Sequence, residues 1–390
     1  MMNRVLFFIV VLFISPLVWS VETIKIGMST ALTGSAAELG LNMQRGIECY
    51  FDTVNKQGGI AGRMLELVVF DDGYEPERAA LNMRQLIDQE QVLAVMGNVG
   101  TPTAIVTAPI AQEKKTLLFG AFSGGGILRP SPANRYIINY RPSYAEEAAE
   151  MVEGLLQAGI KPLEIALFTQ RDGFGDAGYQ AAIKAFHQLG FKDTDRLAHG
   201  RYTRNTLNVE NAVAEILDRP TTPKAVIMAG GYGASAKFIA LLQRELPDLI
   251  FLNLSFVGDY QLKQALGDIE NVIVMQSVPP LESNMPIVKD YLSNLQLFDD
   301  SLEPNSVSLE GFTIAKIFHQ GLLNIKGDIT KESIIDGLEL LHGIDIGLGV
   351  DIFVDEEEHQ AINHIWMTHF KAGKITPFTW PMLQTKTITK

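Results

Sequence analysis

The stretch Asn55-Lys-Gln-Gly-Gly-Ile-Ala-Gly-Arg-Met-Leu-Glu-Leu-Val-Val-Phe-Asp-Asp72 has the clearest local pattern in the chain. Before it, apolar residues recur at helical spacing over residues 43–54, and its own glycines mark a turn. Its second half contains an apolar, β-branched run at residues 65–70 that stops at two aspartates. Residues 23–28 alternate between polar and apolar side chains ahead of the helix. The sequence therefore predicts a β-α-β unit.

The alternation of strand and helix continues from this unit along the chain. Before Tyr140 we expect helices at 77–90 and 101–113, and strands at 92–96 and 116–119. The rhythm restarts after Tyr140-Arg141-Pro142, with helices expected at 146–159, 178–189 and 234–244, and strands at 164–168, 225–228, 249–252 and 272–276. Strict alternation predicts two α/β lobes, each built on a doubly wound parallel sheet.

The last third of the chain has a different order of elements. Helices are expected at 286–295, 308–323 and 331–341, and they follow an extended stretch at Pro279-Pro280. We expect them to cross back to the first lobe. Residues 349–380 alternate like antiparallel strands and would make a third crossing. The expected organisation is a signal peptide at 1–20, a first lobe at 21–140 plus about 279–345, a second lobe at 141–278 plus about 346–380, and a tail at 381–390.

Composition narrows the class of protein. The chain has 390 residues, of which 47% are hydrophobic and 20% are charged, which suits a globular protein with more than one core. Such a composition excludes a mostly disordered chain and a polytopic membrane protein. There are 32 Lys and Arg against 45 Asp and Glu, a net charge of −13. That charge repels phosphate backbones, so nucleic acid is not an expected partner.

The N-terminus is typical of a secretory signal. Arg4 precedes an apolar run at residues 5–18, and Val18 and Ser20 suit the two positions that a signal peptidase reads. We expect residues 1–20 to be removed on export to the periplasm; the alternative is an uncleaved anchor helix, which Pro16 and the short run disfavour. Cys49 is the only cysteine, so no internal disulfide forms, and its apolar helical setting predicts a buried thiol.

Known catalytic patterns are missing from the sequence. It contains no G-x-x-x-x-G-K-[ST], no G-x-G-x-x-G after a strand and no G-x-S-x-G. His359, His364 and His369 are five residues apart, a spacing that does not bring them to one point on a strand or a helix. We therefore expect no enzyme activity, no cofactor and no metal site.

Small hydroxylated loops follow the strands of the first lobe, where ligands of doubly wound sheets bind. They are residues 29–35, 97–103 with Thr101 and Thr103, and 120–124 with Ala121, Phe122 and Ser123. Ordinary helix N-caps are the alternative interpretation of any single loop. Three such loops in one lobe, with hydroxyls beside free backbone N–H groups, suggest a site for a carboxylate. Phe174 and Tyr232, at strand ends of the other lobe, could close over the ligand.

These features together resemble the type I periplasmic solute-binding proteins, in the branch of the leucine/isoleucine/valine-binding protein and the amide and urea receptors. The matching marks are Ile24-Lys-Ile-Gly, Thr33-Gly34, the stretch from Val54 to Arg63, the Asp71-Asp72 pair with Pro76, the Gly97 loop, Phe174-Gly175 and Gly231-Tyr232. The resemblance covers residues 21–380. It implies two Rossmann-like lobes joined by three hinge crossings, which close on a solute like a clamp.

The resemblance also implies roles for single residues. Thr101, Ala121, Phe122 and Ser123 match positions that hold the ligand carboxylate in the amino-acid binders, and Phe174 and Tyr232 match aromatic contacts from the far lobe. The acid that binds the ligand ammonium falls on Ser255, which is a departure from the family pattern. Asp259 or Asp172 could supply the missing charge; otherwise the ligand is a carboxylate or amide without an α-ammonium.

The implied function is that of an exported protein that captures an amino-acid-like or other small carboxylate solute and delivers it to an ABC permease. The alternative is a periplasmic sensor that presents the same kind of solute to a membrane signalling protein. The lobes do not distinguish these two, because the outer surface that docks on the partner decides between them. Hydroxyls, amides and rings favour binding over catalysis in either case, since they provide no poised base or nucleophile.

Overall fold

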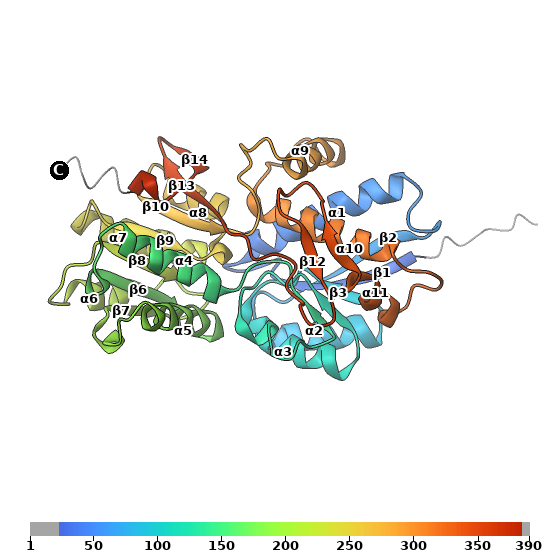
Figure 1. Ribbon diagram of the computed structural model, residues 1–390, viewed down its shortest axis with the longest axis horizontal. Coiled ribbons are helices and arrows are strands. Elements are labelled where there is room, and N and C mark those ends of the chain that lie inside the picture. Colours follow the sequence, from blue (N-terminus) through green and yellow to red (C-terminus); the bar gives the residue numbers. More distant parts are fainter. Residues whose placement is uncertain (1–22, 384–390) are drawn as a thin grey trace, which may run out of the picture.

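The computed structural model describes residues 23–383, which form two α/β lobes side by side along the long axis of the molecule (Figure 1). The expected signal peptide, residues 1–20, lies outside the described residues. Within residues 23–383, no helix combines the length and the apolar character that crossing a bilayer requires.

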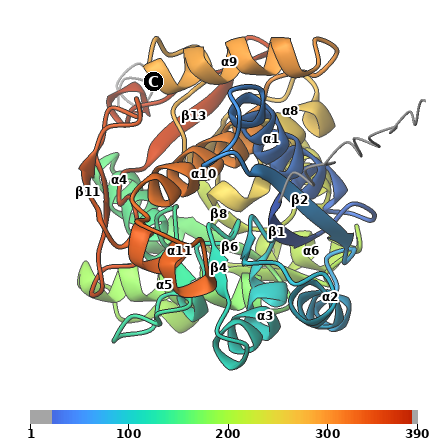
Figure 2. The ribbon, with the colours of Figure 1, turned by 90° about the vertical axis from the view of Figure 1, so that its right-hand side faces the viewer.

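The first lobe is built on a parallel sheet in the order β2-β1-β3-β4-β5. Its strands are β1 (Thr23–Thr30), β2 (Met64–Asp71), β3 (Ala94–Met96), β4 (Leu117–Phe119) and β5 (Ile137–Ile138). Its helices are α1 (Ala37–Lys56), α2 (Pro76–Asp88), α3 (Thr101–Glu113), α9 (Pro286–Phe298), α10 (Ser306–Leu323) and α11 (Lys331–Leu338). Helices α1 and α10 pack together on one face of the sheet, and α2 and α3 cover the other (Figure 2).

The second lobe is built on a larger sheet in the order β14-β13-β10-β9-β8-β6-β7. The parallel strands are β6 (Ile165–Gln170), β7 (His199–Tyr202), β8 (Ala225–Ala229), β9 (Ile250–Asn253) and β10 (Val272–Gln276). β13 (Trp366–Lys371) runs antiparallel to β10, and β14 (Lys374–Pro377) antiparallel to β13. The helices are α4 (Tyr144–Gln157), α5 (Gly173–Gln188), α6 (Glu210–Leu217), α7 (Tyr232–Glu245) and α8 (Asp259–Leu266).

Side-chain alternation explains why both faces of this sheet are covered by helices. Along β6, Ile165 and Leu167 belong to the core on the α4 and α5 side, while Ala166 and Phe168 belong to the core on the α7 side. Such a strand is buried on both faces, which is the usual state of a parallel strand between two helical layers. The two-lobed α/β architecture predicted from the alternation of elements is therefore confirmed.

Polar side chains fix where several helices begin. Ser143 and Glu146 form a capping box at the start of α4, and the Asp172 carboxylate accepts hydrogen bonds from the backbone N–H groups of Phe174 and Gly175 at the start of α5. Asn305 caps α10 in the same way through Ser308. Cys49 is buried on α1 as expected.

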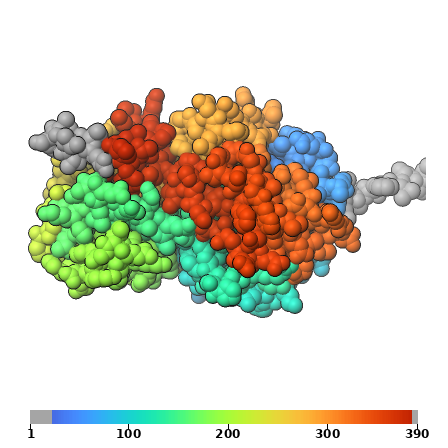
Figure 3. Space-filling view, in the orientation of Figure 1, coloured from blue at the N-terminus to red at the C-terminus, as the bar shows by residue number. Residues whose placement is uncertain are grey.

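The third connection between the lobes lies later in the chain than the sequence analysis placed it. Residues 349–362 were expected in the second lobe, but Asn139 donates to the His359 carbonyl at 2.7 Å and Ala361 donates to the Asn139 carbonyl at 2.9 Å. This segment therefore extends the β5 edge of the first lobe, and the chain crosses between Ile362 and Trp366. The surface of this region, drawn in red-orange, covers one face of the first lobe (Figure 3).

Several shorter elements also differ from the expectation. The helix expected at 331–341 ends at Leu338, and the chain then forms a separate two-stranded sheet of β11 (Leu341–Ile344) and β12 (Ile352–Val354). Four elements, β5, β7, α6 and α8, were not predicted from the sequence. These elements are short, and their apolar patterns span too few residues to stand out.

Candidate functional site

A pair of hydroxyls marks the face of the first lobe that meets the second. Thr101 is the first residue of α3, and Ser123 follows β4. Their Oγ1 and Oγ atoms are 2.8 Å apart, and Ser123 Oγ also accepts the Gly125 N–H at 3.1 Å. The buried hydroxyl of Tyr144 approaches Thr101 but completes no hydrogen bond of normal geometry. We call Thr101 and Ser123, the two first-lobe residues, the hydroxyl group.

The turn before α3 brings this group against the rest of the cleft. Gly100 has φ of 106°, and a Cβ on it would lie 2.2 Å from Cε2 of Tyr74, so only glycine fits. Two other predicted residues of these loops are used within the first lobe. Thr103 donates to the carbonyls of Val99 and Gly100, and the Ala121 side chain packs in the core beside α2 and α3. The structure therefore does not place Thr103 or Ala121 side chains in the cleft.

Aromatic rings from both lobes meet beside the hydroxyl group, and Tyr144 connects the two sets of residues. Phe256, in the short turn between β9 and α8, lies 5.8 Å from Tyr74, 5.7 Å from Phe122 and 4.5 Å from Phe174, centroid to centroid. Tyr144 lies 5.4 Å from Phe174. Tyr74 and Phe122 belong to the first lobe, so the rings join the two lobes. We call these five residues the ring cluster. All of them are buried.

Tyr232 lies beside a small cavity between the lobes. It begins α7 and is half buried, and burial raises the pKa of its hydroxyl. The cavity is lined by residues of both lobes, namely Ser35, Ala36, Leu39 and Tyr74 from the first and Gln170, Tyr202, Asn205, Thr206, Leu207, Gly231, Tyr232, Gly233, Ala234 and Phe256 from the second. Tyr74 and Phe256 therefore belong both to this cavity and to the ring cluster.

Ser255 is part of a buried charged network near the connections between the lobes. Its backbone N and its Oγ donate to the two carboxylate oxygens of Glu147, at 2.8 and 2.6 Å. Arg141 donates through Nε and Nη2 to Glu310 at 2.9 and 2.6 Å, and through Nη1 to Ser255 Oγ at 3.1 Å. Ser277 also donates to Glu310. We call Arg141, Glu147, Ser255, Ser277 and Glu310 the hinge network.

The hinge network holds one more carboxylate than it holds guanidinium groups. Arg141 is paired with Glu310, which leaves Glu147 with hydrogen bonds from Ser255 alone. Burial raises the pKa of Glu147 to about 7, although Arg141 and the Ser255 hydrogen bonds act in the opposite direction. The Arg141 guanidinium also lies over the Phe122 ring, 3.8 Å from its centroid, so the network contacts the ring cluster directly.

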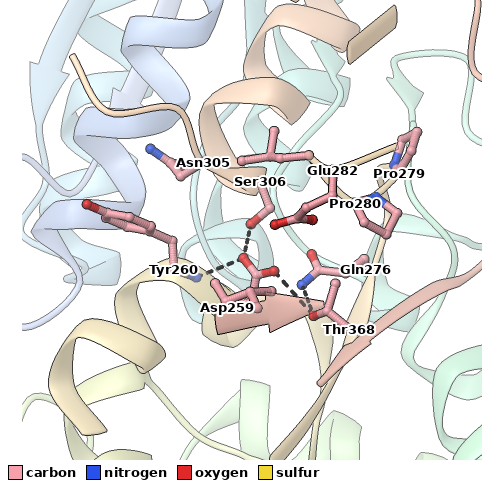
Figure 4. A pocket seen from close by; sticks show the side chains of 11 residues that line it. Asp259, Tyr260, Gln276, Pro279, Pro280, Glu282, Asn305, Ser306 and Thr368 are labelled. Atoms are coloured by element: carbon pink, nitrogen blue, oxygen red, sulfur yellow. Dashed lines mark hydrogen bonds between the residues drawn. The ribbon is translucent and has the colours of Figure 1, made fainter. Parts of the chain in front are cut away.

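Asp259 and Asp172 were the two candidate partners for a ligand ammonium, and the structure places both away from the hydroxyl group. Asp259 lies in a separate pocket, where its carboxylate accepts hydrogen bonds from Ser306, Thr368 and the Tyr260 N–H (Figure 4). Burial raises the pKa of Asp259. Asp172 is occupied by the start of α5 and by Gln170 and Arg204. Neither carboxylate faces the hydroxyl group.

A second set of contacts joins the lobes at the far edges of their sheets. Arg204 and Asn205 follow β7, and they donate to the two oxygens of Glu75 at 2.8 and 2.6 Å. Ser35 donates to the Asn205 side chain at 2.6 Å. Because Glu75 follows the edge strand β2, these contacts lie across the molecule from the connections. We call Ser35, Glu75, Arg204 and Asn205 the rim contacts.

Arg129 supports the Ser123 loop from below. Its guanidinium donates to the carbonyls of Ser123 and Gly125 at 3.3 and 3.1 Å, to the Arg141 carbonyl at 2.7 Å and to Gln360 Oε1 at 2.7 Å. Arg129, Glu147 and Glu310 were not predicted from the sequence; the partners of Glu147 and Glu310 are distant in the chain, and Arg129 lies in a loop without a recognisable motif. The only local signal was the Ser143-x-x-Glu146 capping pattern, which marks the helix that carries Glu147.

Comparison with known proteins identifies the family. A family model described as "Periplasmic binding protein" matches residues 23–374. The chain belongs to the periplasmic binding protein family. Proteins of this family bind solutes and are not enzymes, which agrees with the prediction of binding rather than catalysis.

Individual relatives of this periplasmic binding protein agree with the family. A crystal structure of a possible leucine/isoleucine/valine-binding protein from Rhodopirellula baltica SH 1 is 42% identical, covers 93% of this chain and 98% of its own, and superposes with a TM-score of 0.90. The Leu/Ile/Val-binding protein homolog 2 of Brucella abortus (strain 2308) is 25% identical over 177 residues, 45% of this chain. The chain matches 46% of that protein, about half its length.

The fold is shared with more distant members. The branched-chain amino acid substrate-binding protein LivJ of Streptococcus pneumoniae, solved with isoleucine, superposes with a TM-score of 0.76 at 16% identity, covering 91% of this chain and 98% of its own. At that identity the likeness shows the fold alone. It confirms the type I two-lobed architecture that the resemblance implied.

Proposed function

We propose that this periplasmic binding protein captures an amino-acid-like or other small carboxylate solute between its lobes and delivers it to an ABC importer. The observation that carries the proposal is the hydroxyl group of the first lobe, which Tyr144 connects to a ring cluster made by both lobes. Hydroxyls supply hydrogen bonds to an anionic head, and rings supply apolar contact to the body of the solute.

Entry of a solute requires the lobes to separate. The rings of Phe174 and Phe256 come from the second lobe, Phe256 packs on Phe122 of the first lobe, and Thr101 and Ser123 are buried. Opening about the three connections exposes both faces, and closure excludes water from the bound solute. Hydrogen bonds to the solute then form away from water, where an unpaired polar group costs more free energy than it does in water.

A thermal-shift screen tests the proposal for solute binding. The purified protein is heated with amino acids, amides, and aliphatic and aromatic carboxylates, and hits are checked by calorimetry. A solute at one hundred times its dissociation constant stabilises the folded state by about 2.7 kcal/mol. A solute that binds the wild type and an exposed control variant, Ser301→Ala, but binds Ser123→Ala more weakly supports the proposed site. Equal binding by all three proteins contradicts it.

Delivery is tested separately, by uptake of the labelled solute into the source cells with and without this protein. We expect uptake to depend on the protein. Unchanged uptake together with loss of a transcriptional or motile response to the solute would favour the sensory alternative.

A further inference from the structure

Three observations narrow the chemical class of the solute, and the inference drawn from them rests on the proposed solute-binding function. The ring cluster defines the body of the solute, the hydroxyl group with Arg129 defines its head, and the carboxylates around the cleft define what it lacks. We propose that the solute is a monocarboxylate with a flat apolar, aromatic body and no α-ammonium group.

The body follows from the ring cluster. Phe256 extends from the second lobe and packs against Tyr74, Phe122 and Phe174, at tilted or stacked angles of 29–51°. Rings at these separations favour another flat ring beyond what the burial of apolar area alone contributes. A flat solute enters the same layer of rings when Phe256 and Phe174 move away with the second lobe.

The head group follows from the charge beneath the hydroxyl group. Arg129 donates only to neutral acceptors, which are backbone carbonyls and the Gln360 amide oxygen. In the part of the chain that the structure describes, no carboxylate forms an ion pair with Arg129, and burial lowers its pKa to about 10. Its positive charge lies behind the Ser123 loop, where Glu146 and Glu147 act on it only from a distance. The unpartnered Tyr144 hydroxyl adds a donor on the same side, so an anion is favoured there.

The missing ammonium follows from the partners of the nearby acids. Around the cleft, within residues 23–383, each carboxylate already accepts hydrogen bonds from the protein: Glu38 from Asn42, Asp72 from Ser29 and Tyr74, Glu75 from Arg204 and Asn205, Glu147 from Ser255, Asp172 from α5 and Gln170, and Asp259 from Ser306 and Thr368. An ammonium closed into the cleft would leave its water shell and would have to displace a protein donor from one of these carboxylates, which disfavours binding.

Matched solutes of one shape test this inference. 3-Phenylpropionate and L-phenylalanine have the same ring, chain and carboxylate and differ by the α-ammonium, whereas 2-phenylethylamine carries only the amine. Calorimetry on the purified protein at pH 7.4 should show 3-phenylpropionate binding at least tenfold more tightly than L-phenylalanine, and no binding of the amine.

Tyr144→Phe then tests the position of the head group, with Tyr179→Phe as the matched control. Tyr179 stacks on His199 outside the cleft, so its hydroxyl has no role in the site. The loss of one hydrogen bond to a charged group should weaken 3-phenylpropionate roughly tenfold in Tyr144→Phe and leave Tyr179→Phe unchanged. Equal affinity in all three proteins overturns the placement of the carboxylate.

Other outcomes separate this inference from the proposed function. L-Phenylalanine binding as tightly as 3-phenylpropionate overturns the inference, and loss of that binding in Glu147→Gln would identify Glu147 as the ammonium partner. Binding of a different solute class in the thermal-shift screen, with none of the phenyl compounds, also overturns it. In both cases the solute-binding function stands. Absence of any hit in the whole screen overturns both.

Discussion

The two regions that join the lobes differ sharply in burial and charge. In the hinge network, the side chains of Arg141 and Glu310 are 1% and 2% exposed, whereas at the rim those of Arg204 and Glu75 are 24% and 43% exposed. The hinge network lies at the connections, and the rim contacts lie at the opposite edges of the two sheets.

The difference explains how such a molecule opens without unfolding. A buried charge loses a great deal when it loses its partner, so the hinge network keeps its geometry while the lobes move. An exposed ion pair contributes little and exchanges readily with water, so the rim contacts break and form at small cost. Opening is therefore expected at the rim, about a fixed hinge.

Removing Glu310 should have the largest effect, because it leaves the Arg141 charge buried without its partner. We expect Glu310→Ala to lower the free energy of unfolding by about 3–5 kcal/mol, measured by urea denaturation. Glu113→Ala breaks the surface pair with Arg84 and serves as the control, with little change expected. A similar small change in both variants would show that the hinge network is not the rigid region.

The Glu147 carboxylate should make the stability of the protein depend on pH. The pKa of Glu147 is raised to about 7 by burial, so the folded state binds its proton more tightly than the unfolded state does. That stabilisation is present below the unfolded pKa and is lost as pH rises toward about 7. Relative to Glu147→Gln, the wild type should lose on the order of 1–3 kcal/mol of unfolding free energy across this range. Parallel pH curves for the two proteins would contradict this.

Ser123→Ala should weaken solute binding without a large loss of stability. Its Oγ is available to a carboxylate once the lobes open, and a hydrogen bond to a charged group contributes about 1–2 kcal/mol. Calorimetry with 3-phenylpropionate measures the change, and the urea midpoint checks the fold. An unchanged dissociation constant would remove Ser123 from the site.

Arg204→Ala should have the smallest effect on stability and a visible effect on closure. Loss of the Glu75 pair costs about 1 kcal/mol or less, because both side chains are partly exposed. We expect Arg204→Ala to bind the solute a few fold more weakly than the wild type does, with an affinity that depends less on salt concentration. Arg201→Ala breaks a pair with Asp176 within the second lobe and should leave both unchanged. Equal affinity in the two variants would mean that the rim contacts do not hold the closed state.

The alternation of elements was enough to predict the fold because its signal is local. The helix predicted at 101–113 coincides with α3, and the strand at 272–276 with β10. The third connection was predicted too early in the chain, because the strand-like pattern of residues 349–362 does not show which lobe the segment joins. Only their pairing with Asn139, more than two hundred residues away, decides which lobe they join.

The candidate site was predicted only in part, because a local pattern identifies a loop but not the contacts between residues distant in the chain. Thr101 and Ser123 belong to loops whose positions follow from the sheet order, and the structure brings their hydroxyls together. The contact of Glu147 with Ser255 joins residues 108 positions apart, so no sequence pattern announces it. Phe256 and Tyr74 were not predicted as site residues, because aromatic residues buried between lobes have the same local pattern as those buried within a lobe.

The most direct test of the account is the distance between the lobes with and without solute. Spin labels on Glu77→Cys and Asn208→Cys, exposed positions on either side of the rim, report it, and buried Cys49 does not compete for the label. We predict a broad, long distance distribution for the free protein that contracts to a single short distance with saturating solute. An unchanged distribution, while calorimetry shows the solute bound, would contradict binding between the lobes.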